Sequence, residues 1–146
     1  MSLKILDRLV NNKKLFFTLQ FTWGLLMNII GLLVFAVLII FCKKKPKKFG
    51  DGYYIAVGDN WGGLELGIFF LIDNSESAST KYHEAGHGIQ NAIWGPLFIF
   101  VIWIPSATRY WYRELKSRKG IKPTTSYYSI WFERQASEWG YIYYAN

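Results

Sequence analysis

The two histidines of this chain, His83 and His87, lie four positions apart in the stretch KYHEAGHGIQ, and Glu84 follows the first. On a helix, side chains four residues apart share one face. Two imidazoles in this arrangement can bind one ion at about 2.0–2.1 Å. Glu84 is rotated by about 100° from His83, so its carboxylate would lie beside the ion. This HExxH spacing is typical of a zinc site in which the glutamate is general base for a metal-bound water.

The segment before the motif predicts the helix that would carry it. DNSESAST, at 73–80, is polar and ends in Ser79 and Thr80, which are both suitable helix N-caps. Ile89 and Ile93 give the following helix an apolar side. The alternative is a surface helix with an ordinary glutamate and two solvated histidines.

A hydrolytic zinc ion takes three protein ligands and leaves a fourth position for water. The chain has no further histidine, and Cys42 lies in an apolar run, so the third ligand must be a carboxylate. The candidates after the motif are Glu114, Glu133 and Glu138. Cations flank Glu114 in RYWYRELKSRKG, which predicts a solvated surface carboxylate with local ion pairing. Glu138 lies off the face of Glu133, and we expect it to be solvated as well.

Glu133 lies in SYYSIWFERQASEWG, which predicts a helix over 126–140. Thr125 or Ser126 would cap this helix and Gly140 would end it. Apolar neighbours predict that Glu133 is buried, and a buried lone carboxylate needs a partner. A metal ion would be one.

Residues 15–42 contain no charged side chain. A helix needs roughly 20 apolar residues to cross a hydrocarbon core of about 30 Å, so this run predicts an uncleaved transmembrane helix. The lysines of KKKPKK, at 43–48, would contact lipid headgroups. We therefore expect residues 1–48 to form an N-terminal membrane anchor with basic flanks. Gly24, Asn28 and Gly31 lie on nearly one face of it, where a homo-oligomer contact could form.

Composition narrows the classes of function. The chain is 51% hydrophobic and 19% aromatic, which excludes a disordered protein. Its formal net charge is +7, from 17 Lys and Arg against 10 Asp and Glu. Because lysines border the apolar run, we expect a lipid bilayer and no nucleic acid as partner, although a membrane-tethered nucleic-acid binder stays open. The single cysteine excludes an intramolecular disulfide.

The middle of the chain predicts strands and a second apolar segment. Two β-rich runs, 53–57 and 64–72, are separated by glycine and Asx residues, which predicts a hairpin or small sheet. The motif helix is expected to continue into a second membrane-associated segment near 88–106, kinked at Pro96 and ended by Pro105. Cations flank both apolar segments, so one crossing with a re-entrant segment and two crossings both stay open.

HEAGH followed by a helical glutamate in FERQAS resembles the gluzincin-type zinc metallopeptidases, whose pattern is HExxH plus a downstream ExxxD or ExxAD helix. The closest resemblance is to a small, largely uncharacterised integral-membrane branch, and HEAGHGIQNAIWGPLFIF…IPS is similar to bacterial membrane proteins with an H-E-x-G-H-x-x-Q core. The resemblance covers about residues 52–140. It implies that His83, His87 and Glu133 bind Zn²⁺ and that Glu84 is the catalytic base. Ser137 stands where the family has an aspartate that orients a ligand histidine.

The resemblance also implies a fold and an activity. The fold would be membrane α+β: an N-terminal transmembrane helix, a small β-hairpin or sheet, the HExxH helix continuing into an apolar segment, and a C-terminal helix with the third ligand. Residues 49–146 would be a zincin-like peptidase domain. The protein would belong to the bacterial cell membrane and hydrolyse peptide or membrane-protein substrates at the membrane–water interface through a zinc-activated water.

Peptide hydrolysis would also need a hydrogen-bond donor that stabilises the oxyanion of the tetrahedral intermediate. The candidates are Arg109, Tyr110, Tyr112, Tyr127 and Tyr128. The alternative function is a non-catalytic membrane protein with a structural metal site, such as an assembly or immunity factor.

Overall fold

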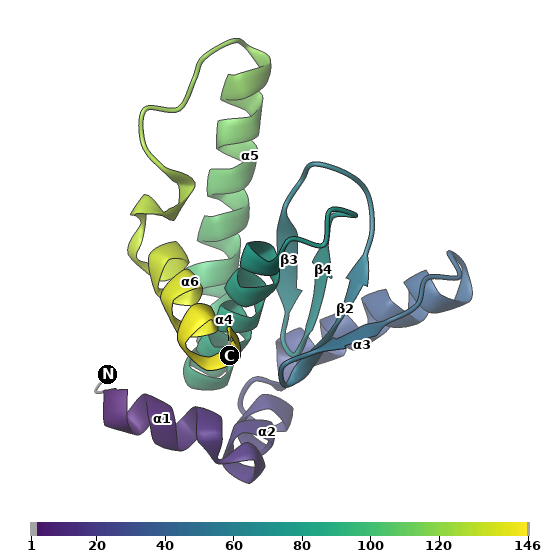
Figure 1. The fold of residues 1–146 in the computed structure, drawn as a ribbon, viewed down its shortest axis with the longest axis vertical. Helices are drawn as coiled ribbons and strands as arrows, with labels where there is room; N and C mark the ends of the chain where they lie inside the picture. Colours follow the sequence, from purple (N-terminus) through teal and green to yellow (C-terminus); the bar gives the residue numbers. More distant parts are fainter. Residues whose placement is uncertain (1–2, 146) are drawn as a thin grey trace.

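The computed structural model describes residues 3–145 and has six α-helices and one four-stranded sheet in that range (Figure 1). This confirms the expected mixed α+β class. The helices and strands in chain order are α1 Leu3–Asn11, α2 Lys13–Phe21, α3 Leu25–Ile40, β1 Lys47–Phe49, β2 Gly52–Ala56, β3 Gly63–Leu66, β4 Phe69–Ile72, α4 Ala78–Trp94, α5 Ile104–Arg118 and α6 Trp131–Tyr144.

The sheet has the order β1-β2-β4-β3, so β3 is an edge strand. β3 and β4 form an antiparallel hairpin, and Gly67 in its turn has φ 84°, a conformation that favours glycine. β2 pairs with β4 in parallel. The expected small sheet is therefore present, but the hairpin lies within the run 64–72 because Gly67 reverses the chain there.

The apolar run 15–42 is not one straight helix. It forms α2 and α3, which meet at 81°. Two amides from this run are buried at the bend. Gln20 donates to the carbonyl oxygen of Gly88 at 2.7 Å, and Asn28 accepts from the Ile68 N–H at 2.7 Å. Because these partners belong to α4 and to the β3–β4 turn, the run folds onto the rest of the chain.

Helix length and apolar composition test whether the two apolar segments can cross a bilayer as expected. Among residues 3–145, no single helix is long and apolar enough to cross a bilayer. Two bent pairs have the length and composition, namely Lys13–Phe21 with Leu25–Ile40, and Ala78–Leu97 with Ile99–Arg118, the second bent by 116°. Only their length and composition make these pairs candidates for crossing a bilayer.

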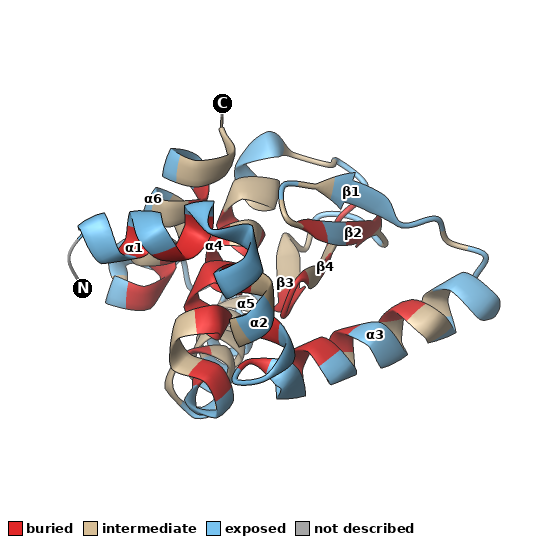
Figure 2. Ribbon diagram, turned by 90° about the horizontal axis from the view of Figure 1, so that it is seen from below, coloured by how far each residue is buried: buried red, intermediate tan, exposed pale blue. Residues whose placement is uncertain are grey.

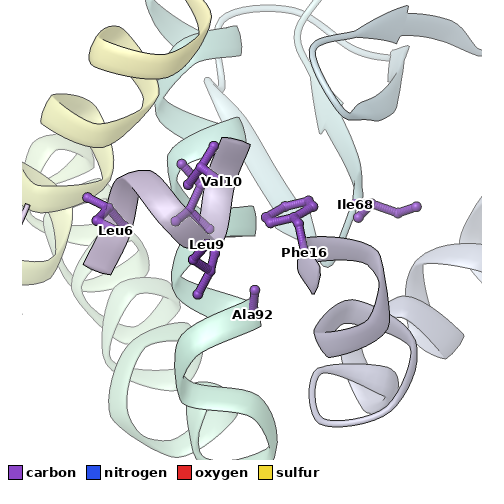
Figure 3. Close-up of a cluster of buried hydrophobic side chains, with 7 residues drawn as sticks. Leu6, Leu9, Val10, Phe16, Ile68 and Ala92 are labelled. Carbon is purple, nitrogen blue, oxygen red and sulfur yellow. The ribbon is translucent and has the colours of Figure 1, made fainter. Parts of the chain in front are cut away.

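A hydrophobic cluster joins the N-terminal helices to the rest of the molecule (Figure 3). Leu6, Leu9 and Val10 of α1 and Phe16 of α2 are buried against Ala92 and its neighbours on α4 and against Ile68 in the β3–β4 turn. Residues before and after position 48 therefore share one core.

Helices α4 and α6 pack with their backbones close together at two glycines. A Cβ atom on Gly86 would lie 1.8 Å from the carbonyl oxygen of Ala136, and one on Gly140 would lie 1.7 Å from that of Tyr82. Gly140 was expected to end the last helix, but α6 continues through it to Tyr144. Gly140 therefore lets α6 approach α4 closely and does not end the helix.

The segment after the motif helix bends instead of continuing. α4 ends at Trp94, and Gly95 has φ 53°. A 3-10 turn (Gly95–Leu97) and a π-helical turn (Ile99–Trp103) then lead into α5. Pro105, which was expected to end a helix, lies in the first turn of α5, where proline needs no hydrogen-bond partner.

Candidate metal centre

Three side-chain atoms converge between α4 and α6. Nε2 of His83 and Nε2 of His87 lie 3.2 Å apart, and Oε2 of Glu133 lies 3.0 Å and 3.3 Å from them. A tetrahedral ion with bonds of about 2.0–2.1 Å separates its ligand atoms by about 3.3 Å. All three residues are buried, and together they could hold a metal ion. The structure thus brings together the three residues that the sequence predicted as ligands.

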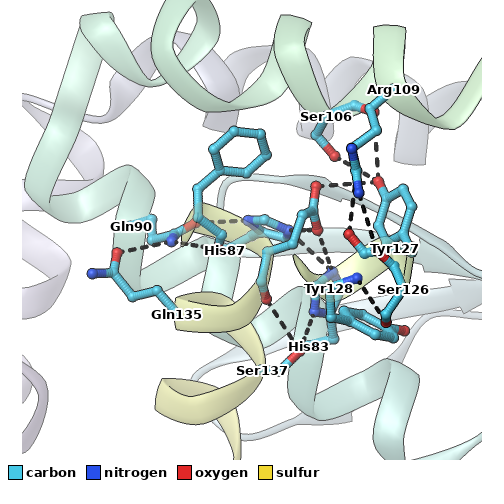
Figure 4. Close-up of polar contacts among 12 residues, drawn as sticks. His83, His87, Gln90, Ser106, Arg109, Ser126, Tyr127, Tyr128, Gln135 and Ser137 are labelled. Atoms are coloured by element: carbon cyan, nitrogen blue, oxygen red, sulfur yellow. Dashed lines mark hydrogen bonds and ion pairs between the residues drawn. The ribbon is translucent and has the colours of Figure 1, made fainter. Parts of the chain in front are cut away.

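The orientation of His83 is set by Ser137 from α6 (Figure 4). The Ser137 hydroxyl donates to the carbonyl oxygen of Glu133 at 3.2 Å and lies 2.8 Å from Nδ1 of His83. Because the hydroxyl has only one proton, its oxygen accepts from Nδ1–H. Nε2 of His83 therefore keeps a free lone pair toward the other two ligands.

His87 is oriented by Gln90, one turn further along α4. The side-chain amide of Gln90 donates to the carbonyl oxygen of Phe132 at 2.9 Å and to Oε1 of Gln135 at 3.0 Å. Its own Oε1 then accepts from Nδ1–H of His87 at 2.7 Å. No role for Gln90 was predicted from the sequence. Its position could have suggested one, because a polar residue three positions after a candidate ligand histidine lies on the same helix face.

Glu133 is held by Tyr127, whose hydroxyl lies 3.1 Å from its Oε1. The Tyr127 hydroxyl is also 2.9 Å from the Ser106 hydroxyl. Arg109 donates to the carbonyl oxygens of Ser126 and Tyr127, which fixes the turn that carries this tyrosine (Figure 4). Oε1 of Glu133 is thus occupied, and Oε2 is left to face the histidines.

The electrostatics of the centre follow from burial and close pairing. Burial raises the pKa of Glu133, but its close pairing with His83 and His87 outweighs burial and holds that pKa well below its usual value. Burial lowers the pKa of His87, but the Glu133 carboxylate outweighs it and raises that pKa to about 9. Glu133 therefore carries a stable negative charge, and a cation bound at the centre would compete with the proton on His87.

Glu84 lies beside the three ligands and outside them. It is buried, and burial raises its pKa to about 8. A Cβ atom on Gly63 of β3 would lie 2.5 Å from Oε1 of Glu84, so the absence of a side chain at 63 gives this carboxylate its place. Glu84, His83 and His87 all line one cavity of about 500 Å³, a size within the range of ligand pockets.

Glu65, a neighbour that the sequence analysis did not single out, lines the same cavity. Its side chain is buried, and its Oε2 has no hydrogen-bond partner among residues 3–145. Trp103 donates from its indole N–H to the Glu65 carbonyl oxygen at 3.2 Å.

The other candidate residues contribute no atom to the ligand triangle. Glu114 pairs with Arg118 at 3.0 Å, as expected, but it is half-buried and lines the cavity. Glu138 is exposed, as expected. Tyr112 is exposed and pairs with Lys116, whereas Tyr110 and Tyr128 line the cavity. The ring of Tyr128 lies 5.1 Å from that of His83.

Comparisons with protein-family models, curated proteins and solved structures found no match for this chain. The chemistry proposed for the site therefore rests on its geometry and on the residues of the motif.

Proposed function

We propose that this chain is a zinc-dependent peptidase in which His83, His87 and Glu133 bind the metal and Glu84 is the base. The supporting observation is the triangle of ligand atoms, 3.0–3.3 Å on each side, beside a cavity that Glu84 also lines. Two imidazoles and a carboxylate are a donor set that zinc prefers, and three protein ligands leave a position open. The resemblance of HEAGH and FERQAS to the gluzincin pattern points to the same chemistry.

Each residue around the triangle has a distinct task. Zinc, when bound, would act as a Lewis acid and lower the pKa of a water molecule. Glu84 would accept a proton at its carboxylate and return it to the leaving amine. A pKa raised by burial toward neutrality suits this exchange. By accepting from the Nδ1–H groups, Ser137 and Gln90 would leave both Nε2 atoms free to bind the ion.

The edge strand β3 offers a place for an extended peptide. The Asp73 N–H donates to the Gly62 carbonyl oxygen, so in the antiparallel ladder the backbone groups of Gly63 and Glu65 point away from β4. The Glu65 carbonyl oxygen already accepts from the Trp103 indole N–H. The backbone groups of Gly63, beside Glu84, are therefore the ones that a peptide could pair with. A peptide pairing there would pass over the metal centre.

The walls of the cavity indicate the kind of peptide and one more catalytic donor. Several aromatic side chains line it, including Trp61, Trp103 and Trp111, which favours apolar substrate side chains. Tyr128 also lines the cavity, whereas the Tyr127 hydroxyl is engaged by Glu133 and Ser106. Tyr128 is therefore our candidate for stabilising the oxyanion.

Metal content of the purified protein tests the ligands. Glu133→Gln should lose most bound zinc, and Glu138→Gln, the same change at an exposed position of the same helix, should keep it. Glu84→Gln should also keep its zinc, because Glu84 is outside the triangle. Equal zinc content in Glu133→Gln and Glu138→Gln would remove Glu133 as a ligand.

Hydrolysis of a library of apolar peptides tests the activity. The wild type should cleave, a chelator should stop cleavage, and added zinc should restore it. Glu84→Gln should be inactive with its fold and zinc retained. Zinc binding without turnover on any peptide would support the structural metal site of an assembly or immunity factor instead.

A further inference from the structure

Helix α3 has apolar residues that stay exposed within the described part of the chain, and exposed positions recur along its length (Figure 2). Leu25, Leu26, Ile29, Leu32, Leu33 and Val37 are all between 40% and 62% exposed. Phe21, at the end of α2, and Trp23, in the α2–α3 turn, are exposed as well. We call these eight residues the α3 face. Exposed apolar surface of this kind marks a membrane or protein interaction site.

The opposite side of α3 packs along the sheet. Asn28 accepts from the Ile68 N–H, and a Cβ atom on Gly31 would lie 2.4 Å from the Leu66 carbonyl oxygen. One turn further, the ring of Phe35 lies 4.9 Å from that of Phe69. From Asn28 to Phe35, α3 is therefore at the same level as the β3–β4 hairpin.

The chain also returns to the sheet directly after α3. β1 starts at Lys47, which pairs with Tyr54 of β2, and both Lys47 and Lys48 are exposed. If α3 crossed a bilayer, this open sheet and its lysines would lie at hydrocarbon depth. Lipid-exposed sheet edges do not occur there, and charged side chains are costly. α3 has 16 residues, or about 24 Å, which is also shorter than a hydrocarbon core of about 30 Å.

We propose that the α3 face binds one leaflet of an anionic membrane, with α3 lying in the membrane plane and not crossing it. Lysines mark both ends of the apolar region, with Lys13 and Lys14 before it and Lys43, Lys44 and Lys45 after it. An in-plane helix with an apolar face and flanking cations inserts its apolar side among the acyl chains and attracts anionic headgroups. This orientation is independent of the metal chemistry.

Two thiols in one molecule distinguish the two orientations. Cys42 is exposed just after α3, and Lys14 is exposed before the apolar region. Lys14→Cys in reconstituted vesicles, treated with an impermeant maleimide, should give molecules with two adducts or none by intact mass, because both thiols face the same side. Detergent-solubilised protein should give two adducts throughout. A majority with one adduct would mean that the segment crosses, and would overturn the proposal.

Vesicle flotation tests the face itself. Leu33→Glu should lower binding to phosphatidylglycerol-containing vesicles at least tenfold, and Ile121→Glu, the same charge at an exposed apolar site on the α5–α6 loop, should leave it unchanged. Wild-type binding should weaken on pure phosphatidylcholine and with added salt. Unchanged flotation of Leu33→Glu would overturn the proposal. So would a wild-type dimer that Leu33→Glu converts to monomer without affecting flotation, because the occupant would then be a second copy of the chain.

Discussion

The hydroxyl of Ser137 lies 2.8 Å from Nδ1 of His83, in the position from which a neighbouring helix can orient a metal-binding histidine. The family that the motif resembles has an aspartate at this point in the sequence. Serine gives the same hydrogen-bond geometry without a charge, so it holds the tautomer of His83 but makes the imidazole a weaker donor to a cation.

Ser137 variants should therefore change zinc affinity in both directions. Ser137→Ala should weaken zinc binding about 10-fold or more, because His83 loses its orienting acceptor, and Ser137→Asp should tighten it. Competition with a chromophoric chelator measures both. Ser79→Ala, which removes an exposed hydroxyl from the first turn of α4, should match the wild type. Equal affinities for Ser137→Ala and the wild type would contradict the assigned role.

Tyr127 and Tyr128 should separate metal binding from turnover. Tyr127→Phe removes the hydrogen bond to Oε1 of Glu133 and should weaken zinc binding by about 10- to 100-fold, since such a bond to a charged group contributes about 1.5–3 kcal/mol. Tyr128→Phe should keep the zinc and lower kcat about 100-fold, as loss of an oxyanion donor does. Zinc titration and steady-state kinetics on both variants check this. Identical effects of the two changes would disprove the division of tasks.

Gly63→Ala should disable the base without removing the metal. The added methyl group would meet three atoms of the Glu84 side chain at 2.5–2.7 Å, so the carboxylate must leave its present position beside the ligand triangle. We expect a fall of at least 10-fold in kcat with unchanged zinc content. Metal analysis and peptide hydrolysis on the same preparation give both values. Full activity would show that Glu84 need not stay where the structure places it.

Gly140→Ala should destabilise the protein, although alanine normally stabilises a helix by about 1 kcal/mol relative to glycine. The new Cβ would lie 1.7 Å from the Tyr82 carbonyl oxygen, so α6 must move away from α4. Overpacking of this kind costs about 1–3 kcal/mol. Because α6 carries Glu133, zinc affinity should fall as well. Denaturant unfolding checks the sign, and a gain in stability would contradict the close helix contact.

Removal of zinc should lower the thermal stability of the folded protein. A ligand at 100 times its Kd stabilises the native state by about 2.7 kcal/mol, which corresponds to roughly 5–10 °C in Tm for a chain of this size. A chelator should therefore lower the Tm of the wild type and leave that of Glu133→Gln unchanged. Differential scanning fluorimetry measures this, and an equal chelator effect on both proteins would place the metal elsewhere.

The sequence by itself determined the ligands of the candidate centre. The spacing of His83 and His87 places them on one helix face by local geometry alone, and Glu133 follows because a carboxylate among apolar neighbours needs a partner. The α+β class and the helix that carries the motif were predictable for the same reason. Hydrophobic period and turn residues act over a few positions, and those positions are visible in the sequence.

Only the tertiary structure decided how these elements meet. Gln20 and Asn28 are compatible with one long uncharged helix, so the sequence does not reveal the bend between α2 and α3. The bend follows from their hydrogen bonds to Gly88 and Ile68, which only the folded chain brings close. The contact between Gly63 and Glu84 likewise joins a strand to a helix. Such contacts link residues far apart in the chain, and they depend on packing and on the burial of polar groups, which no local pattern of residues encodes.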